Sequence, residues 1–171
     1  AWLSQRPIYL ALHEGALRSS FLRGDTDEVF QRAELIIGRA ESVTEKGAAY
    51  EVLNLLYMRD GRYSACLDSG LKYLTELGVG IPANPGNGAL VRELIKVQLK
   101  MRGKKISDLA QLPEITKPPI RIAQSIFPSF SPAAYLHRPN LLSYLLVKNI
   151  GLSLKYGKGP ELPVVMYYYA V

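Results

Sequence analysis

The chain has 171 residues, of which 48% are hydrophobic, and a formal net charge of +6, so it can bury the core of one domain and is not a disordered segment. Its single cysteine, Cys66, excludes an internal disulfide bond and favours a reducing compartment such as the cytoplasm. No stretch approaches the roughly 20 apolar residues that a membrane helix needs, and the N-terminus lacks the pattern of a signal peptide.

The first half of the chain predicts four helices, arranged as one pair over about 7–40 and a second pair over 43–78. Each pair is broken by a glycine, Gly24 or Gly61, which we expect to end a helix in the left-handed conformation. Residues at helical spacing predict the first helix, over 7–23. These residues are Ile8, Leu12, Ala16, Ser19 and Leu22.

Two helix starts are predicted from the spacing of a capping box. In this motif the side chain of the N-cap residue accepts from the backbone amide three positions later, and the side chain of that later residue accepts from the N-cap amide. Asp25 and Glu28 have this spacing after the first glycine break. Ser42 and Glu45 have it before the third helix.

Apolar and aromatic residues in the second pair predict one buried cluster between its two helices. The cluster comprises Tyr50, Leu53, Leu56, Tyr57, Tyr63, Cys66, Leu67 and Leu71.

The segments around the two glycine breaks, 22–33 and 59–70, carry the same pattern 37 residues apart. Internal similarity at a period of about 20 to 50 residues is typical of stacked helical repeats. We therefore predict an all-α fold, a tetratricopeptide-like α-solenoid of antiparallel helix pairs. Cys66 and Gly70 stand where that repeat has a small alanine and an aromatic residue.

The second half, 89–171, is a divergent helical part of the same single domain, which follows a glycine- and proline-rich loop at 79–89. Pro132, Pro139 and Pro160 are expected to limit its helices. The predicted helical segments are 89–102, 106–112, 120–130 and 139–156. In the first of these, Leu90, Leu94, Val97 and Met101 are expected to face inward. Residues 162–171 also read as a short apolar helix that ends abruptly, so we expect the whole of 1–171 to be a piece excised from a longer chain.

One cluster of basic residues is the candidate interaction face, and only Glu93 offsets its charge. A run of this kind is most often a solvated helix face. It can also meet an acidic protein or nucleic acid, although it contains no aromatic residue on which bases would stack. The face comprises Arg92, Lys96, Lys100, Arg102, Lys104 and Lys105.

No catalytic, metal or cofactor site is predicted. The segment 151–158 resembles a phosphate-binding loop, but it has five residues between its glycines and lacks the required Ser or Thr. His13 and His137 lie far apart in sequence, too few for a metal site. Cys66 falls at an inward repeat position, which favours a buried structural role over catalysis.

Four ordered stretches, 74–82, 106–116, 132–142 and 150–161, resemble the helical middle region of large multidomain signalling kinases. Those proteins combine a serine/threonine-kinase-like domain, an AAA-type predicted ATPase, a tetratricopeptide-like region, a GAF domain and often a histidine kinase. The resemblance implies a cytoplasmic, non-catalytic module that links the ATPase to sensor or kinase domains through protein contacts. It carries over no catalytic residue. The alternative is a helical domain that binds nucleic acid through the basic face at 92–105.

Overall fold

The computed structural model describes residues 2–103 and 106–159, and every regular element in this part of the chain is an α-helix or a 3₁₀ turn. Its only β-type pairing is an isolated parallel bridge between Glu114 and Lys158. The all-α prediction is therefore confirmed for the described residues. In chain order the elements are α1 (Trp2–Arg23), α2 (Thr26–Arg39), the 3₁₀ turn η1 (Val43–Lys46), α3 (Gly47–Arg59), α4 (Tyr63–Glu76), α5 (Asn87–Met101), the 3₁₀ turn η2 (Ile106–Gln111), α6 (Pro118–His137) and α7 (Pro139–Tyr156).

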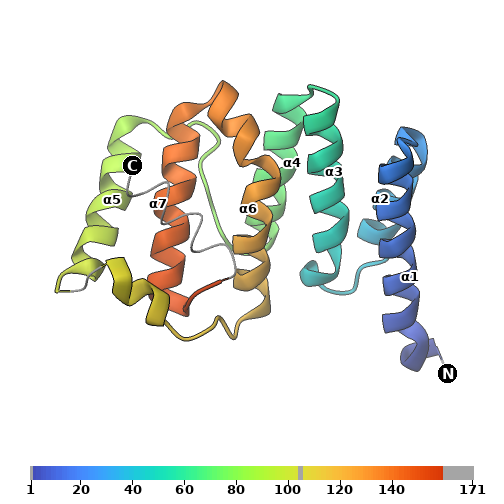
Figure 1. The fold of residues 1–171 in the computed structure, drawn as a ribbon, viewed down its shortest axis with the longest axis horizontal. Coiled ribbons are helices and arrows are strands. Elements are labelled where there is room, and N and C mark those ends of the chain that lie inside the picture. The colour runs from blue at the N-terminus through green and yellow to red at the C-terminus, as the bar shows by residue number, and fades with distance from the viewer. Residues whose placement is uncertain (1, 104–105, 160–171) are drawn as a thin grey trace.

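The helices form a row in which spatial order departs from chain order (Figure 1). Helices α1 to α4 pack against their sequence neighbours, but α4 then contacts α6 rather than α5. Helix α6 contacts α7, and α5 packs against the other side of α7. As a result α1 lies at one end of the row and α5 at the other.

The predicted glycine breaks are confirmed by the backbone. Gly24 has a φ of 79° and Gly61 a φ of 69°, both in the left-handed region. After Gly24, the Asp25 amide donates to the Ser20 carbonyl at 3.0 Å, and after Gly61 the Arg62 amide reaches back in the same way. These bonds close a Schellman motif, which satisfies carbonyl groups that the helix end leaves free.

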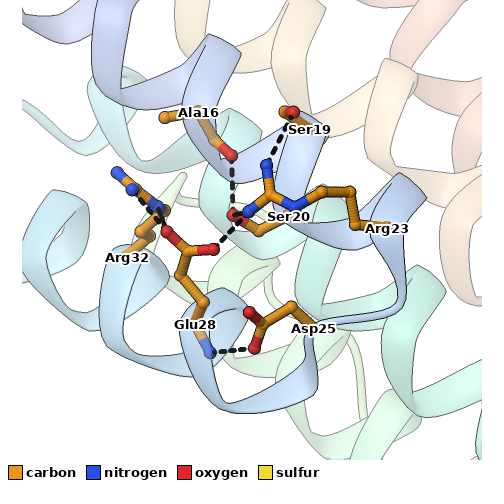
Figure 2. Close-up of polar contacts among 7 residues, drawn as sticks. All are labelled: Ala16, Ser19, Ser20, Arg23, Asp25, Glu28 and Arg32. Atoms are coloured by element: carbon orange, nitrogen blue, oxygen red, sulfur yellow. Dashed lines mark hydrogen bonds and ion pairs between the residues drawn. The ribbon is translucent and has the colours of Figure 1, made fainter.

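The first predicted capping box is half formed (Figure 2). Asp25 Oδ1 accepts a hydrogen bond from the Glu28 amide at 3.1 Å, as expected for an N-cap. The Glu28 carboxylate does not return to Asp25. It instead accepts hydrogen bonds from Arg32 at 2.9 and 2.5 Å and forms an ion pair with Arg23, so it joins α1 to α2.

The second predicted capping box is wrong. The Ser42 side chain makes no capping hydrogen bond and lies 2.9 Å from the Thr44 hydroxyl. The Glu45 carboxylate accepts from the Glu41 amide at 2.8 Å and from Arg6 of α1 at 2.8 Å. The segment Val43–Lys46 forms a short 3₁₀ turn directly before α3 begins.

The apolar residues whose spacing predicted α1 are mostly not the ones it buries. Ile8, Leu12 and Leu22 are 63%, 68% and 83% exposed, whereas Leu17 is fully buried. Helix α1 packs mainly against α2 and α3, which meet the side that carries Leu17 and the half-buried Phe21. The longer apolar stripe therefore faces outward from the end of the row.

The predicted single cluster around α3 divides into two, because α3 lies between two layers. Leu53 and Leu56 pack with α1 and α2. Tyr50 packs with Cys66 and Leu67 of α4 in the larger cluster that also includes α6 and α7. The members Leu71, Tyr57 and Tyr63 belong to this larger cluster too, the two tyrosines being only half-buried.

Helix α6 does not end where predicted. It runs through Pro128 and Pro132 to His137, although a proline removes a backbone hydrogen bond. Phe130 and Ala133 beside these prolines are fully buried, and tertiary packing of that kind outweighs a local helix breaker. The limit expected at Pro139 is confirmed as the start of α7, and the one at Pro160 lies outside the described residues.

The two departures from the tetratricopeptide pattern in α4 both face α6. Cys66 Sγ lies 3.9 Å from the Ser129 carbonyl oxygen. A Cβ atom on Gly70 would lie 2.5 Å from Phe130 Cδ1. Small residues at these positions therefore let α6 pack closely on α4, and the aromatic ring comes from α6 instead.

Candidate basic interaction face

Helix α5 carries the basic residues that the structure describes. Arg92, Lys96 and Lys100 are exposed and spaced four residues apart, so they form one stripe along the helix. Arg102, also exposed, is the C-cap residue just beyond it. Lys104 and Lys105 lie outside the described residues.

The stripe points outward because the opposite side of α5 is apolar. Val97 is 1% exposed and packs against Val147 and Ile150 of α7. Leu90, Leu94 and Met101 are half-buried around the same cluster, in agreement with the face predicted from sequence.

A second stripe on α5 was missed by the sequence analysis. Val91, Ile95 and Leu99 are 51%, 50% and 65% exposed and are also spaced four residues apart. Each directly precedes a basic residue of the stripe already described, so the two stripes run side by side. The four-residue spacing of these apolar side chains was the signal available in the sequence.

Glu93 offsets part of the charge of this face and joins it to α7. The residue is 7% exposed, and its carboxylate accepts from Lys96 at 3.1 Å and from Lys148 of α7 at 3.4 Å. Burial alone would raise the pKa of Glu93, but the two ammonium groups outweigh it, so the pKa is lowered and the carboxylate stays charged. Lys148 was not predicted because it lies 55 residues away in sequence.

The other candidate residues are explained by packing. Cys66 is fully buried, its thiol donates to the Asn54 carbonyl at 3.4 Å, and burial raises its pKa to about 12. His13 and His137 pack against Tyr9 and Tyr63, with ring centroids 4.2 and 4.6 Å apart.

The glycine-rich segment 151–158 is not a phosphate loop. Gly151 lies inside α7, and Gly157 is the C-cap of that helix with a φ of 110°. A phosphate loop must lead into the start of a helix, whereas this segment ends one. Within the described residues, no group of three or more His, Cys, Asp and Glu side chains is placed to hold a metal ion.

Comparison with known proteins adds no relative: no family model, no curated protein and no solved structure matches the chain. None of the described helices is long and apolar enough to cross a membrane.

Proposed function

We propose that this chain is a non-catalytic helical interaction module that binds protein through the exposed side of α5. The observation that carries the proposal is the pair of stripes on that helix, Val91, Ile95 and Leu99 beside the basic residues. Exposed apolar side chains that are rimmed by charge are typical of protein-binding surfaces.

The free energies available from the two stripes favour a partner that covers the apolar stripe, as a protein can, over one that binds through charge alone. Fully burying an aliphatic side chain contributes about 1.5–3 kcal/mol, so three side chains that are already half-buried offer roughly 3 kcal/mol together. Exposed ion pairs contribute only about 0–1 kcal/mol each. The basic stripe therefore selects an acidic partner, while the apolar stripe supplies most of the affinity.

We further propose that the fold is a divergent tetratricopeptide-like solenoid of antiparallel helix pairs. The Schellman breaks at Gly24 and Gly61 support this, because each joins two packed helices by a turn of two or three residues. Modules of this class present extended surfaces to protein partners. By its resemblance to signalling kinases, the module would link an ATPase to sensor or kinase domains in a longer cytoplasmic protein.

A second candidate function is nucleic-acid binding through Arg92, Lys96, Lys100 and Arg102. It is favoured by their exposure along one side of α5. It would make affinity for an oligonucleotide fall steeply with salt concentration, because each phosphate contact releases counterions. The apolar stripe would have no role in nucleic-acid binding.

A photo-crosslinking amino acid at Ile95, in the protein expressed from its own gene, separates the two functions. The matched control carries the same group at Ser64, an exposed position on α4. We expect adducts at Ile95 but not at Ser64, and mass spectrometry should assign them to a peptide with apolar and acidic residues. Adducts that nuclease removes would support nucleic-acid binding instead, and equal labelling at both positions would refute a binding surface on α5.

A further inference from the structure

A basic pocket lies between α5 and α7, on the inner side of the α5 basic stripe. Its cavity volume is about 290 Å³. Lys96 and Lys100 reach it from α5, and Lys148 and Lys155 reach it from α7. No local sequence pattern predicts this site, because α5 and α7, which are separated in the chain by η2 and α6, each supply two of its lysines.

The charge of the pocket is not balanced from within. Four lysines face one carboxylate, Glu93, which leaves three net positive charges in the lining. Glu93 binds Lys96 and Lys148. In the part of the chain that the structure describes, no carboxylate lies within 4.0 Å of Lys100 or Lys155, so neither charge is neutralised by an ion pair there.

Tyr156 lines the pocket next to two ammonium groups. The ammonium groups of Lys155 and Lys117 lie 4.7 and 5.2 Å from the centre of its ring. A hydrogen bond from Lys155 and the charges of Lys117 and Lys100 lower the pKa of the Tyr156 hydroxyl below its ordinary value. An anion in the pocket would meet the same field.

Glycines make part of the wall. Gly78 and Gly80, in the turn after α4, and Gly151 of α7 all line the cavity. Gly78 has a φ of 80°, and no neighbouring atom lies within 4 Å of where a Cβ on Gly78 or Gly80 would be. Backbone without side chains on one side, with ammonium groups on the other, allows a small anion to approach closely. Val97 and Leu152 form an apolar floor.

We propose that this pocket binds a small phosphate-bearing anion, a phosphomonoester or a diphosphate. Lysine ammonium groups bind phosphate as point charges, and a phosphate offers enough oxygens for several of them at once. The cavity is at the lower limit of the volumes of small-molecule sites, which start near about 300 Å³, so it suits a compact ligand rather than a polymer. The pocket shares Lys96 and Lys100 with the basic stripe, but the proposal does not depend on the apolar contact assigned to Val91, Ile95 and Leu99.

Calorimetric titration of the chain with inorganic diphosphate at low ionic strength tests the pocket. The double variant Lys100→Gln with Lys155→Gln should bind about tenfold more weakly or worse, because two of the four lysine ammonium groups of the pocket are lost. The matched control, Lys72→Gln with Arg121→Gln, removes the same charge from exposed positions outside the pocket and should bind within about twofold of the parent. Equal urea midpoints establish that both variants fold.

Two further measurements locate the site and its source of phosphate. Nuclear magnetic resonance should show the Gly78, Gly80 and Gly151 amide signals shifting with diphosphate. Co-sedimentation with vesicles of anionic phospholipid distinguishes a lipid headgroup from a free phosphate, and in either arm binding must be lost in the Lys100/Lys155 variant. Absence of binding in both arms, or the same loss in the control variant, overturns the proposal.

Discussion

Replacing Gly70 with alanine should destabilise the protein, although alanine is the better helix former. An ideal Cβ at this position would lie 2.5, 2.6 and 2.9 Å from three ring atoms of Phe130. Carbon atoms in contact normally lie about 3.5–4.0 Å apart, so the ring or the helix must move by about 1 Å. Phe130 is fully buried and its ring lies 6.1 Å from that of Phe127, which leaves little room for it to move.

Two opposing effects set the magnitude. Overpacking a core costs about 1–3 kcal/mol. Exchanging glycine for alanine inside a helix contributes about 1 kcal/mol in the favourable direction. We therefore expect Gly70→Ala to lower the free energy of unfolding by about 1 kcal/mol, and by up to about 2 kcal/mol where the ring cannot relax.

Gly15→Ala is the matched control, because Gly15 also lies inside a helix but a Cβ there would meet nothing within 4 Å. It should raise the free energy of unfolding by about 0.5–1 kcal/mol, opposite in sign to Gly70→Ala. Urea titrations followed by circular dichroism measure both. In a Phe130→Leu background the cost of Gly70→Ala should shrink or disappear. If Gly70→Ala stabilises the chain as much as Gly15→Ala does, the close contact between α4 and α6 is wrong.

Three further predictions follow from local features. Gly24→Val and Gly61→Val should each lower the free energy of unfolding by at least about 1 kcal/mol, because a β-branched residue is strained at the observed positive φ; urea midpoints that do not change would contradict the left-handed turns. Cys66, with its pKa raised to about 12, should react with iodoacetamide far more slowly in the native chain than after denaturation, and equal rates would mean that it is exposed. Hydrogen bonds from Arg32 are the main cause that lowers the pKa of Glu28 from 4.5. The stabilisation that Glu28 gives the folded state is therefore complete above its unfolded pKa and is lost as the pH falls through its folded pKa. Glu28→Gln should lower the urea midpoint at neutral pH and should make that midpoint fall less on acidification.

Local sequence was sufficient to predict the helix ends that depend only on backbone conformation and on hydrogen bonds between near neighbours. Only glycine adopts positive φ without strain, so Gly24 and Gly61 predicted the breaks between helices directly. The aspartate after Gly24 likewise predicted its N-cap, because that hydrogen bond spans three residues. The apolar spacing of 89–102 predicted α5 and its buried side, and the basic spacing predicted the stripe that lies outward from it.

The candidate site could be predicted only in part. Arg92, Lys96 and Lys100 share one helix, so their spacing showed that they lie together. Lys148 and Lys155 join them only because α5 packs on α7, a contact that no periodicity within either helix encodes.

Tertiary packing decided the rest, since apolar spacing shows that a helix has an apolar side but not what will cover it. Leu17 is buried and Leu12 exposed because α2 and α3 meet only one side of α1. Helix α6 continues through Pro128 because its flanking residues are held in the core. Helix propensities differ by about 1 kcal/mol per residue, and a proline inside a helix costs about 3 kcal/mol. Burying one aromatic side chain stabilises the fold by about 3–5 kcal/mol, which is enough to offset such a proline. The larger energy, set by residues distant in sequence, therefore determined which side of each helix is buried and which lysines meet.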